Sequence, residues 1–198
     1  YSERHCWPVL EPLARYLGCE AVLLADATGN GGPFDEQLSG LWSQLPRLLA
    51  EAGESVPPPV GCASTTVELR GECDVSHDLA RQDAQAVWAY LQHLGVVAGP
   101  APALPPARCE ATPLAGSETL YAPAPGVLVF AARPGQRLAT GDVVAEVIDP
   151  IAGTAHSVRA GTTGVLYAHI LGRYVQTGLE IGKIAGAVPF RTGNLLGN

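Results

Sequence analysis

The apolar and polar positions in the first half of the chain follow the periods of helices and strands in turn. Residues 7–18 carry an apolar stripe at helical spacing and end at Gly18, which predicts a short helix. Residues 20–26 form a continuous apolar run between turn residues, which predicts a strand buried on both faces. Leucines at helical spacing predict a further helix over 38–52, which Pro46 should kink or split.

The segment TTVELRG, residues 65–71, alternates between apolar and polar residues, which predicts a strand. Val67 and Leu69 would point to one face and Glu68 to the other. Because Gly71 follows at once, Glu68 is expected near the carboxyl end of that strand. A carboxylate there costs free energy unless it is solvated, paired or used. Two interpretations stay open: a salt-bridged or edge-exposed carboxylate, and a general base where α/β folds place their ligands.

Residues 77–94 give the clearest helical pattern of the chain. Ser76 is a suitable N-cap, and Gly95 should stop the helix. Its apolar stripe is expected to consist of Ala80, Ala84, Val87, Leu91 and Leu94. The alternation of strands and helices predicts an α/β layer with a mainly parallel sheet.

Periodicity divides the chain into four parts. Residues 1–99 hold the α/β pattern, and residues 100–117 are rich in Pro and Ala without any period, which is typical of a linker. Residues 118–187 consist of short apolar strands and turns, and residues 188–198 form a tail. We therefore predict an α/β domain followed by a small β module.

The β module contains an internal repeat. Gly126 aligns with Gly164 and Gly141 with Gly178, a shift of about 38 residues. Two such units, each too small to close a core alone, should pack into one small barrel or sandwich. The residues expected to face its core are Val127, Val129, Val143, Ala145, Val147, Val165, Tyr167, Leu179 and Ile181.

This repeat resembles a biotinyl/lipoyl carrier domain. A carrier needs a lysine at the tip of the hairpin between the two halves, whereas Lys183, the single lysine of the chain, lies at the far end. The lipoyl-like fold is therefore expected without the carrier function.

Composition excludes several classes of function. The chain has 198 residues, is 47% hydrophobic and carries a net charge of −7, so a sizeable core is expected and nucleic acid is not. No apolar run is long enough to span a membrane. The five cysteines show no CxxC spacing, which indicates reduced thiols in a cytoplasmic protein. The chain contains no Met, so we expect a fragment of a longer protein.

The histidines give no recognisable metal motif. Neither an HExxH sequence nor a GxSxG nucleophile pattern occurs. His5 is adjacent to Cys6, but two neighbouring ligands do not make a site. No metal ligands are therefore assigned within this chain.

Several segments together resemble the succinylglutamate desuccinylase/aspartoacylase family, which is related to the M14 zinc carboxypeptidases. They are "FDE…LW" in 34–42, "TTVELRG-ECDV" in 65–75, "DA-AVWAYLQHLGVVAG" in 83–99 and the β module. The resemblance runs from about residue 1 to 187 and covers the C-terminal portion of the family pattern. It implies a partial three-layer α/β/α zinc-carboxypeptidase-like domain, followed by a lipoyl-like β-barrel/sandwich module.

The same resemblance implies a zinc-dependent amidohydrolase that cleaves an N-acyl amino acid or a similar small amide. Glu68 matches the family glutamate that activates the zinc-bound water and passes its proton to the leaving amine. Arg70 would project from the same strand face as Glu68, and it could bind a substrate carboxylate or pair with an acidic neighbour. Tyr174 is the nearest match to a family tyrosine that reaches toward the substrate. The zinc ligands of the family, a His-x-x-Glu pair and a later His, are expected before Tyr1. The fragment alone should then be inactive and should not hold zinc tightly.

One alternative from another class stays open, together with the assembly state. A non-catalytic binding or adaptor protein would use the lipoyl-like module for assembly with a partner. An enzyme of this family would act on a small-molecule substrate, without nucleic acid or membrane, and a homo-oligomer is possible for either.

Overall fold

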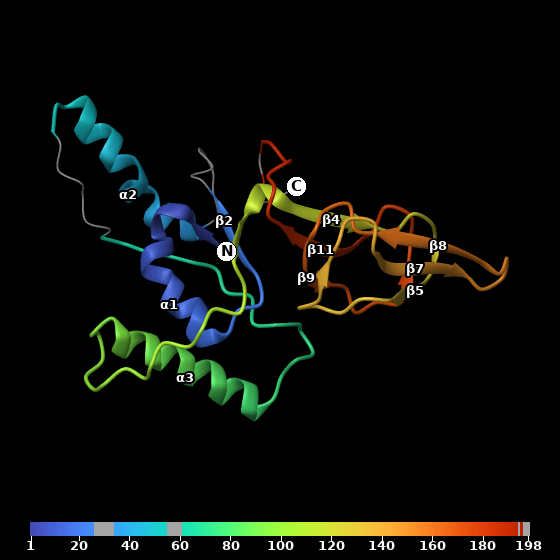
Figure 1. The fold of residues 1–198 in the computed structure, drawn as a ribbon, viewed down its shortest axis with the longest axis horizontal. Coiled ribbons are helices and arrows are strands. Elements are labelled where there is room, and N and C mark those ends of the chain that lie inside the picture. The colour runs from blue at the N-terminus through green and yellow to red at the C-terminus, as the bar shows by residue number, and fades with distance from the viewer. Residues whose placement is uncertain (26–33, 55–60, 194, 196–198) are drawn as a thin grey trace. The chain divides into compact units, whose positions relative to one another are not determined.

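The computed structural model describes residues 1–25, 34–54, 61–193 and 195. The chain divides into two units, Tyr1–Glu110 and Ala111–Gly193, each with its own internal contacts. The first unit carries the long helices, and the second consists almost wholly of strands (Figure 1). None of the helices in the described part of the chain is long and apolar enough to cross a membrane.

The first unit begins with a strand that leads directly into a helix. Strand β1 (Ser2–Glu3) is followed by a 3-10 turn, η1 (Arg4–Cys6), and by helix α1 (Trp7–Leu17). The helix ends at Gly18, which adopts φ 65°. The N–H groups of Gly18 and Cys19 then bond the carbonyls of Arg15 and Ala14, a Schellman ending. The helix predicted over 7–18 is confirmed.

Two more predicted elements follow. Strand β2 (Val22–Ala25) pairs in parallel with β1 through Ser2↔Leu24 and Glu3↔Ala25, so the strand predicted at 20–26 is confirmed. Helix α2 (Phe34–Glu51) runs through Pro46 as a single element. The helix is therefore not split at Pro46, although the proline nitrogen has no hydrogen to donate to the helix.

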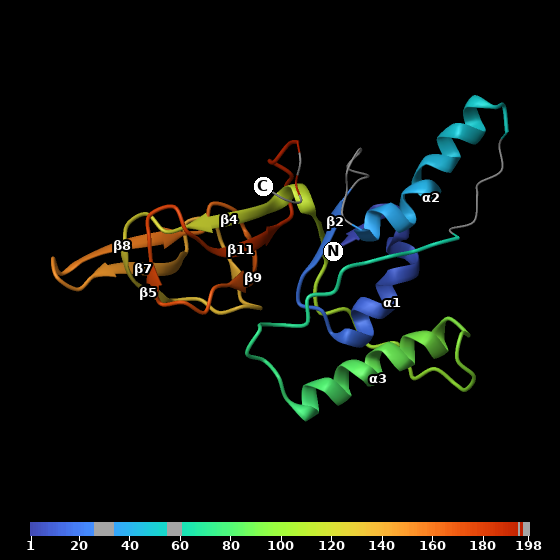
Figure 2. The ribbon, with the colours of Figure 1, turned by 180° about the vertical axis from the view of Figure 1, so that it is seen from behind.

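Helix α3 (His77–His93) confirms the clearest prediction from the sequence. The Ser76 hydroxyl accepts a hydrogen bond from Leu79 N–H at 3.2 Å, and Gly95 follows the helix at φ 72°. In Figures 1 and 2, α3 lies beside α1. Tyr90 joins Cys6 and Leu10 in the small core between these helices, and its hydroxyl donates to the Val9 carbonyl.

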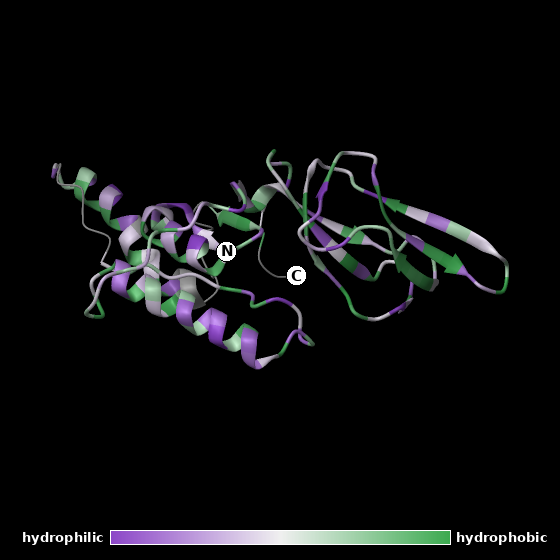
Figure 3. Ribbon diagram, turned by 60° about the horizontal axis from the view of Figure 1, so that its bottom comes forward, coloured by the Kyte–Doolittle hydropathy of each residue, from purple (hydrophilic) through white to green (hydrophobic). Residues whose placement is uncertain are grey.

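The face of α3 that is buried differs from the predicted one. The buried residues are Ala86, Ala89 and Tyr90, whereas Val87 and Leu94 of the predicted stripe are exposed. Figure 3 shows hydrophobic and hydrophilic residues interspersed along the helix. Because apolar residues lie on more than one face, the position of α1 decides which face is covered.

The prediction of a strand at residues 65–71 is wrong. Thr65 forms one isolated antiparallel bridge with Ser2, and residues 66–69 belong to no strand. Val67 and Leu69 are 40% and 54% exposed. An alternating sequence becomes a strand only when a neighbouring strand satisfies its backbone groups, and the described residues supply such a neighbour at one position only.

The second unit contains nine strands and a 3-10 turn within its described residues. They are β3 (Ala111–Pro113), η2 (Leu114–Gly116), β4 (Ser117–Tyr121), β5 (Gly126–Phe130), β6 (Arg137–Leu138), β7 (Val143–Asp149), β8 (Thr154–Arg159), β9 (Gly164–His169), β10 (Tyr174–Val175) and β11 (Glu180–Gly186). Regular structure thus begins at Ala111, inside the segment for which the sequence predicts a linker.

Eight of these strands form two antiparallel sheets, in the orders β10-β5-β7-β8 and β4-β11-β9-β6. The two sheets share one core, in which Leu128, Val147, Leu166, Val175, Ile181 and Ile184 are fully buried. The sequence predicts either a small barrel or a sandwich for this unit. The described residues form two open sheets with a common core and no closed barrel.

The two sequence repeats exchange short strands. In the first repeat, β6 pairs with β9 of the second repeat through Leu138↔Gly164. In the second repeat, β10 pairs with β5 of the first through Val175↔Gly126. Each sheet therefore contains strands from both repeats, and neither repeat completes a sheet without the other.

The residues predicted to face the core of this unit are buried in some strands and exposed in others. Ala145, Val147 and Ile181 are buried as expected. In β5, however, Leu128 is buried while Val127 and Val129 are more than one-third exposed, so the expected faces are reversed there. The run Val-Leu-Val is apolar on both faces, and alternation alone cannot assign its inner side.

Gly164→Ala is expected to destabilise the second unit. A Cβ at this position would collide with the backbone carbonyl of Ala185 on β11 and would lie 2.9 Å from Ile184 Cγ2. Overpacking of this kind costs about 1–3 kcal/mol, which thermal unfolding followed by circular dichroism would detect. Gly172→Ala is the matched control, because nothing lies within 4 Å of the point that its Cβ would occupy. Equal melting temperatures for the two variants would contradict the close approach.

Candidate functional site

The segment that carries Glu68 is tied to the first residues of the chain. The Tyr1 amino group donates to the Thr66 carbonyl at 3.0 Å, and the Thr66 N–H donates to the Tyr1 carbonyl at 3.1 Å. The Thr65 hydroxyl donates to the same Tyr1 carbonyl at 2.5 Å. Residues 65 and 66 are therefore fixed, and the chain then runs outward to Glu68.

Glu68 itself is exposed and has no hydrogen-bond or ion-pair partner within the described part of the chain. The sequence left two structural explanations for this carboxylate, a salt bridge or simple exposure. Within the described residues no salt bridge is formed, and the side chain is exposed. An unpaired, accessible carboxylate can accept a proton and release it again, which is the property a general base needs.

Arg70, two residues further on, pairs with helix α3. Its Nη1 and Nη2 donate to the two carboxylate oxygens of Asp83 at 2.7 and 2.9 Å. These hydrogen bonds lower the pKa of the Asp83 carboxyl, and the same pairing raises the pKa of Arg70. The backbone of Arg70 lies in the left-handed region at φ 66°, a conformation uncommon for a non-glycine residue. The bidentate pair helps to hold the backbone turn that follows Glu68.

An open apolar groove of about 480 Å³ lies in the same unit. It is bounded by Leu13, Leu17, Val67, Leu69, Asp83, Ala84, Val87, Trp88 and Leu91. Ala84, Val87 and Leu91 belong to the stripe predicted for α3, so that stripe faces this groove. The two apolar residues flanking Glu68 line the groove as well.

Tyr174, the third residue singled out from the sequence, lies on β10 of the second unit. Its side chain is 67% exposed, and its hydroxyl accepts a hydrogen bond from Gln176 Nε2 at 3.4 Å. The hydroxyl proton is still available to a ligand. Glu68 and Arg70 thus lie in the same segment of the first unit, whereas Tyr174 belongs to the second unit.

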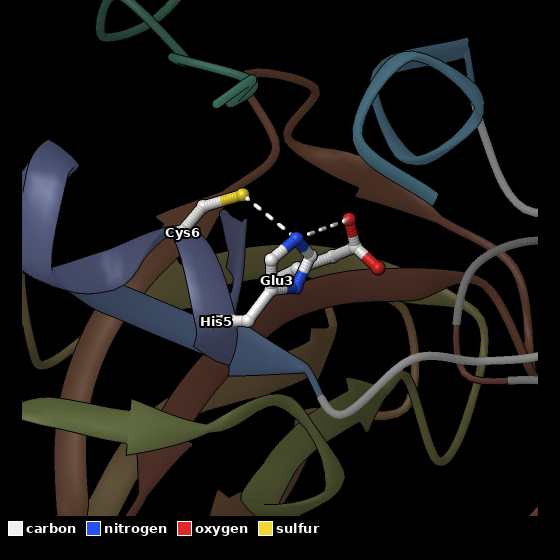
Figure 4. Close-up of side chains that lie close together, drawn as sticks. All are labelled: Glu3, His5 and Cys6. Carbon is white, nitrogen blue, oxygen red and sulfur yellow. Dashed lines mark hydrogen bonds and ion pairs between the residues drawn. The ribbon is translucent and has the colours of Figure 1, made fainter. Parts of the chain in front are cut away.

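A second group of chemically active side chains lies at the start of the chain (Figure 4). Glu3 ends β1, His5 lies in η1 and Cys6 precedes α1. His5 Nε2 is 3.3 Å from Cys6 Sγ and 4.0 Å from Glu3 Oε2, and the three ligand atoms all lie within 4.8 Å of one another. Sequence reasoning considered His5 and Cys6 and missed Glu3. The signal was available, since Glu, His and Cys occur within four consecutive residues.

The surroundings of this group are buried and polar. Glu3 is 3% exposed, and the Ser39 hydroxyl donates to its Oε2. Cys6 is fully buried, and desolvation raises the pKa of its thiol. All five cysteines of the chain are free thiols.

No family model matches the sequence, and no curated protein matches it. Solved structures do match. A protein from Shewanella frigidimarina, assigned as a succinylglutamate desuccinylase/aspartoacylase, is similar with a TM-score of 0.78 and 23% identity. The match covers 94% of this chain and 49% of that one.

Two further structures support the same comparison. A succinylglutamate desuccinylase/aspartoacylase family protein from Shewanella amazonensis gives a TM-score of 0.78 at 23% identity, with 93% of this chain and 50% of that chain covered. The ectoine utilization protein EutE (DoeB) from Ruegeria pomeroyi gives 0.59 at 13% identity, with 94% and 53% covered.

The chain therefore spans about half the length of the solved structures that it matches. The resemblance found in the sequence is confirmed at the level of the fold, which is mixed α/β. Over nearly all of its length, this chain has the fold of succinylglutamate desuccinylase/aspartoacylase family proteins.

Proposed function

We propose that this chain is part of a zinc-dependent deacylase that cleaves an N-acyl amino acid or a similar small amide. The observation that carries the proposal is the fold match over 94% of the chain with a protein assigned as a succinylglutamate desuccinylase/aspartoacylase. In this proposal, the first unit is part of a three-layer α/β/α catalytic domain, and the second is a lipoyl-like module. The free thiols favour a reducing compartment, the cytoplasm.

Glu68 is the proposed general base. Its carboxylate takes a proton from the attacking water and passes it to the nitrogen of the leaving amine. Its exposure and its lack of an ion pair within the described residues support this role. A carboxylate held in a salt bridge would be a weaker base, because the positive partner stabilises its charged form.

The zinc ion implied by the resemblance lowers the pKa of a bound water to about 7 when it is present. The His-x-x-Glu pair expected to hold it does not occur in this sequence. The Glu3, His5 and Cys6 group differs from that ligand set in its chemistry. We therefore place the catalytic zinc ligands in the part of the protein that would precede Tyr1, and none of them in this chain.

Arg70 and Tyr174 are the proposed substrate-binding residues. The guanidinium of Arg70 has five N–H donors, and its bonds to Asp83 leave several of them for a substrate carboxylate. Tyr174 is exposed and can donate its hydroxyl proton. The apolar groove beside Val67 and Leu69 offers a surface for aliphatic parts of a substrate or for another part of the longer protein.

The test of the function is direct hydrolysis by the longer protein that contains this chain. Purified protein would be incubated with N-succinyl, N-acetyl and bulkier N-acyl amino acids, and release of the free amino acid would be measured. Zinc-dependent release from at least one of them is expected. The absence of hydrolysis across the series, with zinc bound and the protein folded, would reject the proposal.

Arg70→Met should raise KM for an anionic N-acyl amino acid by about 10–100-fold, since a hydrogen bond to a charged group is worth about 1.5–3 kcal/mol. The effect on a neutral amide analogue of the same substrate should be much smaller. Arg81→Met is the matched control, because Arg81 forms an exposed pair with Asp78 on α3. Equal changes in KM for the charged and neutral substrates would assign Arg70 a structural role only.

A further inference from the structure

We infer that Glu3, His5 and Cys6 form a binding site for a divalent metal ion such as Zn²⁺ or Co²⁺. A carboxylate, an imidazole and a thiolate are all ordinary ligands of Zn²⁺ and Co²⁺. They come from four consecutive residues and converge on one point (Figure 4). This site goes beyond the proposed deacylase activity and does not rest on it. It replaces the expectation from the sequence that the chain alone holds no zinc tightly, because that expectation considered His5 and Cys6 without Glu3.

The ligand atoms lie close enough together to take up the spacing of a tetrahedral ion. Metal–ligand bonds of about 2.0–2.3 Å separate neighbouring ligand atoms by about 3.4–3.6 Å. In the structure, His5 Nε2 lies 3.3 Å from Cys6 Sγ and 4.0 Å from Glu3 Oε2. The third pair, Cys6 Sγ and the Glu3 carboxylate, also lies within 4.8 Å, so side-chain adjustments of about an ångström or less would bring all three ligand atoms to these separations. The His5 side chain is 26% exposed, so a water molecule would supply the fourth ligand from solvent.

The backbone holds the three ligands in place. Glu3 is fixed by the parallel pairing of β1 with β2, in which it lies opposite Ala25. Cys6 is the N-cap residue of α1, which fixes the position of its side chain at the start of the helix. His5 lies in the 3-10 turn between them. A preformed arrangement of this kind lowers the entropy cost of binding.

Burial and charge also favour a cation here. Glu3 is almost fully buried, and the Ser39 hydroxyl donates to its Oε2. A buried carboxylate carries a desolvation cost that a bound cation would offset. Cys6 is fully buried, and a bound divalent ion would displace the thiol proton and balance the charges of the thiolate and the carboxylate. The same group without a metal would be a hydrogen-bonded network only.

The 198-residue chain is the protein to test, because it lacks the His-x-x-Glu pair expected to hold the catalytic zinc. Apo protein would be titrated with Co²⁺ and followed by absorption spectroscopy. One Co²⁺ per chain should bind, with a thiolate-to-cobalt charge-transfer band and intense tetrahedral d–d bands, and Zn²⁺ should displace it. The absence of both bands would overturn the site.

Variants separate the site from adventitious binding. Glu3→Gln and His5→Gln should each weaken binding at least about tenfold, and Cys6→Ser should abolish the charge-transfer band. Cys73→Ser and His77→Gln are the controls, because both residues are exposed and lie outside the group. Circular dichroism would verify that the variants fold, and Glu3→Gln and His5→Gln provide the test if Cys6→Ser does not. Retention of wild-type affinity in both folded variants would reject the proposal, whereas the proposed hydrolase activity would be unaffected.

Discussion

Glu68→Gln in the longer protein should lower kcat by about 10²–10⁴-fold, the range expected when a general base is lost. Glutamine keeps the size and shape of the side chain but cannot accept a proton from water and return it to the leaving amine. Because Glu68 is exposed and unpaired within the described residues, the substitution breaks no structural contact there. Zinc content, substrate affinity and melting temperature should therefore change little.

Single-turnover kinetics would check this result most directly, since they measure the chemical step apart from product release. Glu72→Gln is the matched control, because Glu72 is another exposed glutamate four residues along the same segment. It should leave kcat unchanged. Near-normal turnover in Glu68→Gln would remove Glu68 from the mechanism, even if the protein proves to be a deacylase.

Truncation after Pro150 should abolish folding of the second unit, whereas residues 111–193 alone should give a cooperative β domain. The truncation removes β8 to β11 and with them Leu166, Val175, Ile181 and Ile184, which are all fully buried. Burying one such side chain contributes about 1.5–3 kcal/mol, so their combined loss is comparable to the total stability of a small domain. The exchanged strands add to the effect, because β5 and β6 both lose their pairing partners from the second repeat.

Far-ultraviolet circular dichroism and thermal unfolding of the two fragments would test this expectation. Residues 111–193 should unfold in one transition, and residues 111–150 should show no transition at all. A cooperative transition in the shorter fragment would show that one repeat is stable alone. Failure of the longer fragment to fold would instead show that the second unit depends on the rest of the chain.

The helices were largely determined by the sequence. Ser76, Gly18 and Gly95 are local signals, because a cap bonds backbone groups within a few residues of itself. The apolar run around β2 was equally clear, since a strand buried on both faces needs no choice of side. The repeat in the second unit also predicted two interdependent halves, although it did not show that β6 and β10 would be exchanged.

Faces and pairings were decided by the tertiary structure. The segment 65–71 alternates like a strand but forms a single bridge, because pairing depends on a partner elsewhere in the chain. In β5, Leu128 and not its two valine neighbours turned inward, because all three are apolar and only the facing sheet selects a side.

The candidate sites show the same division. Glu68, Arg70 and Tyr174 were found from the order of motifs along the chain, without knowledge of their contacts. The pairing of Arg70 with Asp83 and the approach of Glu3 to His5 required the fold, since the first spans thirteen residues and the second depends on the turn between β1 and α1. Local sequence fixes which groups are present and where helices end, whereas packing and pairing between distant segments decide which of those groups meet.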